Sequence, residues 1–244
     1  VLLQHPDTLT KFADELIAKM NPTGDMFKLT VNWLINHYSK SKIMGLDAVY
    51  VHMAEKYYLT GKAYWADSAT IAKLEERAKA MAPTLIGKKA PAINLFDTTG
   101  NRLVPLYSVQ SPYTILYFWD SGCGHCKKET PKLKKIYDVV KDKGVEVYAV
   151  GTELETEDWK KYIKENDLDW INVSDTPDKI IDNFRQNYDI YATPKAYLLD
   201  AEKKIIVKQV GVYQLGQILK DKLKLPADTD YGLEKPKDDE EEEE

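Results

Sequence analysis

The chain has 244 residues, 43% hydrophobic and 11% aromatic, which suits one large core or two smaller ones and excludes a wholly disordered protein. Its formal net charge is −5, but seven acidic residues form the terminal run 238–244, so the remainder holds 34 basic and 32 acidic residues. That near-neutral body lacks the concentrated Lys and Arg of a nucleic-acid groove. No window approaches the roughly 18 apolar residues of a membrane span.

Apolar side chains recur at helical spacing in four stretches of the first third, namely 9–20, 27–38, 46–57 and 71–81. We therefore expect residues 1–86 to form an all-α helical domain. Two interpretations stay open for it. The helices either pack only on themselves and on the next domain, or they present a docking or dimerisation surface.

Residues 87–226 change to short strands that alternate with helices. The expected elements are a hairpin (92–96 and 102–106), a buried strand (113–119), a helix (127–143) kinked at Pro131 and closed by Gly144, a strand (145–151), a helix (157–166), a strand (170–173), a helix (178–187), an antiparallel pair (196–199 and 205–210) and a last helix (213–223). This order predicts an α/β domain with a mixed central sheet flanked by helices. Residues 227–244 are expected to form an acidic, disordered tail.

The chain has two cysteines, Cys123 and Cys126, just past the predicted strand 113–119. Two cysteines are too few for a disulfide scaffold, and a zinc site needs two further ligands nearby. Three of the four histidines, His5, His37 and His52, lie far away in the sequence, and His125 sits inside the pair. We therefore expect no metal.

A strand that turns directly into a helix presents unpaired backbone N–H groups at its end. These groups and the helix dipole favour a thiolate at Cys123, whose pKa should fall, while Cys126 lies one turn further in and suits a resolving thiol. Gly124 leaves the approach of a partner open, and a charged His125 imidazole would stabilise the thiolate further. An inert disulfide is the alternative, but the strand before and the helix after favour a redox pair.

The motifs Phe-Trp at 118–119, Cys-Gly-His-Cys at 123–126 and Thr-Pro at 193–194 together resemble thioredoxin. The continuation Lys-Lys-Glu-Thr-Pro at 127–131, the preceding hairpin, and the extra helix and strand between 154 and 184 narrow the resemblance to TlpA/ResA-like thiol-disulfide oxidoreductases. The resemblance covers roughly residues 88–225. Residues 1–86 more weakly resemble the helical segment that precedes such domains in some bacterial envelope proteins.

The resemblance implies an enzyme that exchanges disulfides with protein thiols and disulfides and that depends on an upstream thiol electron donor or acceptor. It implies the periplasm or cell envelope of a bacterium, with a signal peptide or lipid anchor upstream of Val1 as the only membrane contact. No cofactor is expected, because the chain has no Gly-rich phosphate loop.

Several roles follow from the resemblance by position. Pro194 is expected to be cis and to face the cysteines, with the backbone of Thr193 pairing with a partner peptide and Trp119 supporting the site. Glu129 matches an acidic residue that influences cysteine protonation in the ResA-like branch, although a surface helix carboxylate explains it equally well. Asp120 either takes part in proton transfer or is an exposed turn residue.

The sequence also departs from thioredoxin. Tyr117 stands where thioredoxin has a buried Asp, and Gly122 replaces a Trp. His125 gives the dipeptide of protein disulfide isomerases, which moves the expected reduction potential from about −270 mV toward about −180 mV. The direction of exchange, as a reductase or as an isomerase, therefore stays open.

Two other functions compete with the oxidoreductase. A thiol peroxidase of the peroxiredoxin kind shares this fold, but it needs Thr or Ser where this chain has Asp120 and Pro where it has Leu116. A non-enzymatic, redox-sensing binding module would use the helices of 1–86 to recruit partners.

Overall fold

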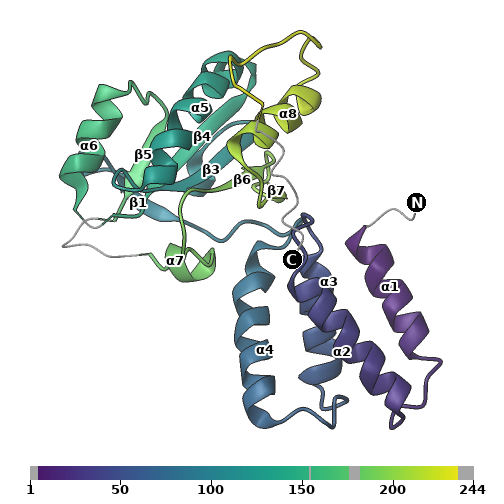
Figure 1. Ribbon diagram of the computed structural model, residues 1–244. Coiled ribbons are helices and arrows are strands. Elements are labelled where there is room, and N and C mark those ends of the chain that lie inside the picture. The colour runs from purple at the N-terminus through teal and green to yellow at the C-terminus, as the bar shows by residue number, and fades with distance from the viewer. Residues whose placement is uncertain (1–4, 154, 176–181, 236–244) are drawn as a thin grey trace. The chain divides into compact units, whose positions relative to one another are not determined.

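The computed structural model describes residues 5–153, 155–175 and 182–235 (Figure 1). These residues divide into two compact units: one holds the described residues up to 91 together with 185–189, and the other holds the described residues of 92–184 and 190–235. Within the described parts of the chain, no helix is both long enough and apolar enough to cross a bilayer.

The first unit is helical. It contains α1 (Pro6–Ile17), α2 (Asp25–Ser39), α3 (Asp47–Met53), the π-helical turn η1 (Ala54–Tyr58) and α4 (Ser68–Met81), followed by a 3-10 turn at Ala82–Thr84. The helix α3 packs against α1, α2 and α4, so its residues Val49, Tyr50 and Met53 are almost completely buried. The four predicted apolar stretches are confirmed as helical, except that the first ends at Ile17 rather than at residue 20 and the third is divided between α3 and η1.

The second unit is built on one mixed sheet. Among the described residues, seven strands pair in the order β2 (Leu103–Pro105), β1 (Asn94–Asp97), β5 (Ile171–Ser174), β4 (Val145–Gly151), β3 (Tyr113–Trp119), β6 (Lys195–Leu199) and β7 (Ile205–Lys208). Strands β3, β4 and β5 are mutually parallel, and the other pairs are antiparallel. The predicted buried strand is confirmed, because residues 115–119 of β3 have no exposed surface.

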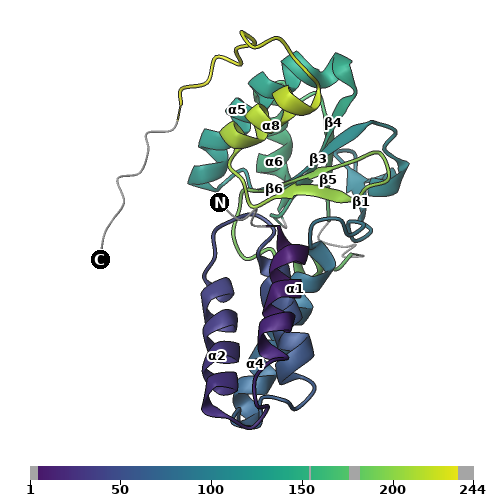
Figure 2. The ribbon, with the colours of Figure 1, turned by 90° about the vertical axis from the view of Figure 1, so that its right-hand side faces the viewer.

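Helices α5 (Gly124–Val140) and α6 (Thr156–Glu165) connect the parallel strands, and α8 (Val212–Lys222) lies beside α5 in both views (Figures 1 and 2). Pro131 lies inside α5 without ending it. Gly144, predicted to close this helix, follows a 3-10 turn (Lys141–Lys143) with φ of 85°. A Cβ there would approach the Pro112 side chain to 2.8 Å, so both backbone and space require glycine.

Two segments differ from the expectation. The helix expected over 178–187 is helical only in α7 (Phe184–Asn187), while residues 176–181 lie outside the described residues. The chain expected to be disordered from 227 continues to pack, because Tyr231 is buried and its hydroxyl donates to the Gly216 carbonyl at 3.1 Å. Tyr231 anchors the segment together with two lysines, since Lys220 donates to the Thr229 carbonyl at 3.0 Å and Lys135 to the Gly232 carbonyl at 3.1 Å. Residues 236–244 of the predicted tail lie outside the described residues.

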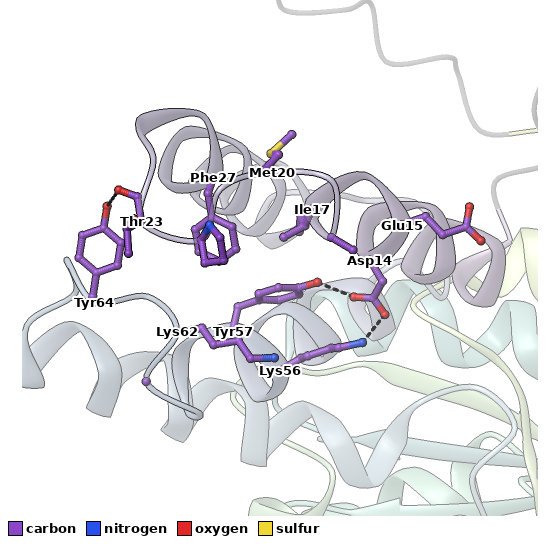
Figure 3. A pocket seen from close by; sticks show the side chains of 13 residues that line it. Asp14, Glu15, Ile17, Met20, Thr23, Phe27, Lys56, Tyr57, Lys62 and Tyr64 are labelled. Carbon is purple, nitrogen blue, oxygen red and sulfur yellow. Dashed lines mark hydrogen bonds and ion pairs between the residues drawn. The ribbon is translucent and has the colours of Figure 1, made fainter.

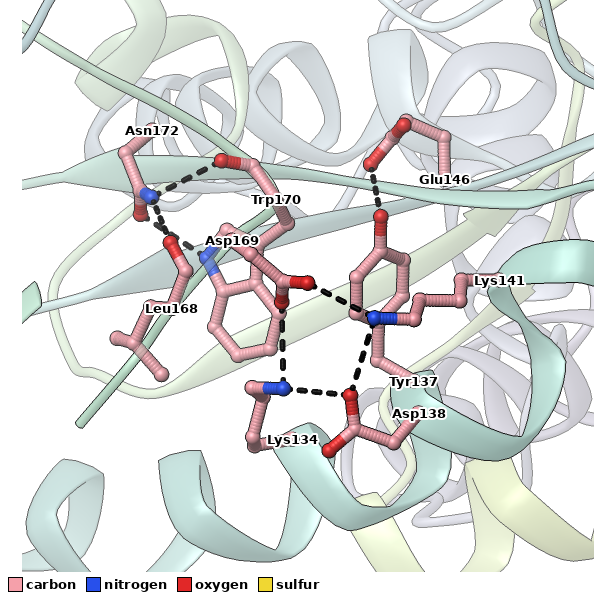
Figure 4. Close-up of polar contacts among 9 residues, drawn as sticks. All are labelled: Lys134, Tyr137, Asp138, Lys141, Glu146, Leu168, Asp169, Trp170 and Asn172. Atoms are coloured by element: carbon pink, nitrogen blue, oxygen red, sulfur yellow. Dashed lines mark hydrogen bonds and ion pairs between the residues drawn. The ribbon is translucent and has the colours of Figure 1, made fainter.

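Polar contacts tie α5 to the loop before β5 (Figure 4). The buried Asn172 amide accepts from the Trp170 indole at 2.9 Å and donates to the carbonyls of Leu168 and Trp170 at 2.9 and 3.0 Å. Nearby, the half-exposed Asp169 carboxylate forms ion pairs with Lys134 of α5 at 3.2 Å and with Lys141 of the 3-10 turn after α5 at 2.8 Å. The buried amide and the exposed ion pairs differ in energetic importance, since water screens only the latter.

Replacing Asn172 with Ala should lower the free energy of unfolding by about 2–4 kcal/mol, because it leaves one buried indole N–H and two carbonyls without their partner. Asp169→Asn, which weakens two ion pairs, should cost less than about 1 kcal/mol. Urea denaturation followed by circular dichroism measures both. Equal losses in the two variants would contradict this ranking.

Candidate functional site

The cysteine pair lies where the central strand β3 turns into α5. Cys123 is the N-cap residue of α5, and its sulfur accepts the backbone N–H of Cys126 at 3.5 Å. The Cys123 carbonyl accepts the N–H of Lys127 at 3.0 Å and so begins the helical hydrogen bonds. A sulfur therefore occupies the place that a Ser or Asp oxygen takes in most N-caps.

The two thiols differ sharply in exposure. Cys123 is partly exposed, whereas Cys126 is 1% exposed, and both are free thiols. The Cys126 sulfur accepts the backbone N–H of Asp120 at 3.4 Å. Gly124 leaves the approach to the pair open, since a Cβ at this position would meet nothing within 4 Å.

The two thiols also differ in acidity. Burial raises the pKa of Cys123, but hydrogen bonds outweigh it and bring this pKa below its usual value: the largest contribution comes from the Cys126 N–H, smaller ones from Thr193 and the Cys126 side chain, and the smallest of these from the His125 N–H. Burial raises the pKa of Cys126 to about 12. Cys123 is therefore the thiol that ionises first.

The Thr193–Pro194 segment faces Cys123. Its peptide bond is cis, as expected from the resemblance, and the Cys123 thiol donates to the Thr193 carbonyl at 3.3 Å. A hollow of about 360 Å³ beside it is lined by Thr193, Pro194, His125, Glu129 and others. The structure thus brings four of the predicted supporting residues to one surface.

The side chains of His125 and Glu129 do not act on the cysteines through a direct contact with sulfur. The His125 residue is exposed, and the contribution that it makes to the Cys123 pKa comes from its backbone N–H. Glu129 is half-buried and pairs with Lys132 at 2.6 Å. Glu129 therefore borders the hollow as one half of an ion pair on the α5 surface.

Asp120 is a turn residue in the structure. Its carboxylate accepts the Gly122 N–H at 2.6 Å, and its carbonyl accepts the Cys123 N–H at 3.2 Å. Its backbone N–H, not its carboxylate, is the group that reaches Cys126. Trp119 is fully buried, with its ring 5.4 Å from that of Tyr162, and it supports the strand end as part of the core.

Two contacts near the site were not predicted. The Glu153 carboxylate accepts the Ser121 N–H at 2.9 Å, and burial raises the pKa of Glu153 above its usual value. The Tyr117 hydroxyl, at the position of the thioredoxin Asp, is fully buried and shares a hydrogen bond with Thr130 at 3.1 Å. The sequence did hold a signal for the Glu153 contact. Glu153 follows the end of β4, and the carboxyl ends of neighbouring parallel strands meet at one edge of the sheet, near the end of β3.

The fold and the paired thiols define a thioredoxin-like oxidoreductase. A family model described as the AhpC/TSA family matches residues 86–208, about half of the chain, and the chain belongs to this family. It is 30% identical over 126 residues to the thiol-disulfide oxidoreductase ResA of a Bacillus cereus strain, a match that covers 52% of this chain and 70% of that relative.

Solved structures agree with this class. A domain of a possible thiol-disulfide isomerase from Cytophaga hutchinsonii is 46% identical with a TM-score of 0.54, and the match covers 59% of this chain and 96% of that domain. The match to a thioredoxin-like protein from Bacteroides caccae is longer. It covers 88% of this chain and 77% of that protein, with a TM-score of 0.68. At 22% identity, this second likeness shows the fold alone.

The difference in acidity predicts selective alkylation. In the reduced protein at pH 8, iodoacetamide should label Cys123 and leave Cys126 unmodified, with a rate that rises with pH through a pKa below that of a free cysteine, because the thiolate forms as pH rises. In Cys123→Ser, burial of Cys126 persists, so labelling should begin only at strongly alkaline pH. Mass spectrometry of the labelled peptides measures this, and equal labelling of both cysteines would contradict the assignment.

Proposed function

We propose that this thiol-disulfide oxidoreductase exchanges disulfides with the cysteines of partner proteins, with Cys123 as the nucleophile and Cys126 as the resolving thiol. The observation that carries the proposal is the accessible, more acidic Cys123 at the helix N-terminus beside a buried, less acidic Cys126. A thiolate is the attacking species in this chemistry, so the order of acidity assigns the order of attack.

The reaction has two steps. The Cys123 thiolate attacks one sulfur of a partner disulfide, so that a mixed disulfide forms and the other partner sulfur leaves as a thiolate. Cys126 then loses its proton and attacks the Cys123 sulfur, which releases the second partner thiolate and leaves the Cys123–Cys126 disulfide. The partner gains two electrons, and an upstream dithiol donor must return them for another turnover. In the opposite direction the same steps oxidise a partner.

The Thr193–Pro194 segment supports a polypeptide substrate. The Thr193 carbonyl already lies 3.3 Å from the Cys123 sulfur, so an extended peptide paired with this backbone would present its own sulfur to Cys123. For its place of action we propose the periplasm or cell envelope of a bacterium, which rests on the family resemblance. A peroxidase is less well supported, because the Asp120 carboxylate binds the Gly122 N–H at the place where a peroxidase needs Thr or Ser.

Trapping tests the two roles. Cys126→Ala should accumulate mixed disulfides between Cys123 and partner proteins, because the resolving thiol is absent, whereas Cys123→Ala should accumulate none. Non-reducing electrophoresis of envelope extracts, with mass spectrometry of each trapped peptide, provides the readout. Partner binding that survives Cys123→Ala but is lost when residues 1–86 are deleted would instead favour the redox-sensing module.

The reduction potential tests how His125 acts. The N–H groups at Cys123 stabilise the thiolate and hence the reduced state, so we expect a value nearer −180 than −270 mV, measured against a glutathione buffer. His125→Pro removes the backbone donor at a position in the first helical turn where proline is tolerated, and it should lower the potential by about 30 mV or more. His125→Ala keeps the N–H and should change the potential less. The reverse order would assign the effect to the imidazole.

A further inference from the structure

The helical unit contains a cavity of about 680 Å³ that the cysteine chemistry does not use (Figure 3). It lies between the C-terminal half of α1, the start of α2 and the segment from η1 to residue 64. Its apolar wall is formed by Ile17, Met20, Phe27 and Pro22. The volume falls in the range of about 300–1,000 Å³ that is usual for small-molecule sites, which are likewise mostly apolar with a few convergent polar groups.

One end of the cavity is closed by a polar cluster around Asp14. The Asp14 carboxylate accepts hydrogen bonds from Lys56 Nζ at 2.6 Å, from Tyr57 Oη at 2.7 Å and from His52 Nε2 at 3.0 Å. Burial raises the pKa of Asp14, but these donors outweigh it and bring the pKa below its usual value. Asp14 is therefore ionised at neutral pH, and its charge is offset by Lys56.

The π-helical turn η1 creates this arrangement. Lys56 and Tyr57 are consecutive residues of η1, and both reach Asp14 across the cavity end, as Figure 3 shows. Single π turns within helices are rare and are frequent at functional sites. The turn therefore holds two polar groups at the edge of an otherwise apolar wall.

Lys62 leaves an excess positive charge at the cavity. The other acidic residue that lines the cavity, Glu15, points away from it in Figure 3, and its Oε1 atom lies 3.9 Å from Lys11 Nζ. The Lys62 ammonium lies 5.5 Å from the centre of the Tyr57 ring. Among the lining residues, all of which the structure describes, Lys62 is the ammonium with no carboxylate within ion-pair distance.

We propose that this cavity binds an amphiphilic monoanion, a molecule with an apolar chain and one carboxylate. The chain would cover Ile17, Met20 and Phe27, and the carboxylate would pair with Lys62. Charge complementarity selects the anion, because the Asp14 charge is already matched by Lys56 and its other donors. The apolar wall selects the chain.

Methionine NMR tests the place of binding in the full chain. All five methionines lie in the helical unit, with Met20 lining the cavity and Met26 exposed outside it. Titration of [ε-¹³C]methionine-labelled protein with octanoate, below its micelle concentration, should shift the Met20 methyl signal, which Met20→Leu identifies by its loss. The Met26 signal should not move. Equal shifts of all five signals, or no shift, would overturn the proposal.

Calorimetry tests the chemistry. Octanoate should bind more tightly than 1-octanol, octyltrimethylammonium or butanoate. Lys62→Gln should weaken octanoate binding about tenfold through loss of a charged partner, while Lys40→Gln, an exposed lysine outside the cavity, should not. Ala18→Trp fills the cavity from an exposed helix end without touching the core, and it should abolish binding.

Equal affinity for the neutral and cationic octyl compounds would overturn the proposal and assign the cavity to an uncharged apolar partner. The inference does not rest on the proposed function. Lys62→Gln should leave the disulfide exchange rate of the Cys123–Cys126 pair unchanged, so failure of one proposal is distinguishable from failure of the other.

Discussion

The N–H groups in the first turn of α5 are the constraint on which the site depends. The first backbone N–H groups of a helix have no preceding helical carbonyl to which they can donate. Here one of them, the Cys126 N–H, donates to the Cys123 sulfur. That bond strengthens when the sulfur becomes negative, whereas an oxygen cap would stabilise the helix without changing any reactive group. The need of the helix end for a hydrogen-bond acceptor therefore stabilises the Cys123 thiolate relative to the thiol.

The sheet holds that helix end in place. β3 is paired on both sides and has no exposed surface over residues 115–119, so its carboxyl end is rigid where the loop to α5 begins. The loop is then fixed by hydrogen bonds from its own backbone: Ser121 N–H to Glu153 from the end of β4, and Gly122 N–H to Asp120. Rigid elements, rather than contacts between the cysteines and other side chains, position the sulfurs.

The sequence was most informative where a pattern was local. Both central strands and the residue order around the cysteines follow from apolar runs and from the strand-to-helix turn, and the ends of β3 and β4 agree with the prediction. It was least informative where a contact joins distant residues. Nothing local shows that Tyr231 is anchored on the Gly216 carbonyl, or that Glu153 binds the loop of Cys123. The same limit explains why the prediction for His125 considered its imidazole. A sequence shows the side chain, but it does not show which backbone N–H points at a sulfur.

In the proposed reaction, the unequal acidities of the two thiols set the order of the steps. Cys123 would react first because it is partly exposed and its thiolate accepts hydrogen bonds, while Cys126 stays protonated at neutral pH with a pKa of about 12. In a mixed disulfide, Cys123 carries no charge, so its repulsion of a Cys126 thiolate disappears. Burial, the larger cause of the raised pKa, remains. The proposed second step therefore depends on removing a proton from a buried sulfur, which accepts a hydrogen bond from the Asp120 N–H at 3.4 Å.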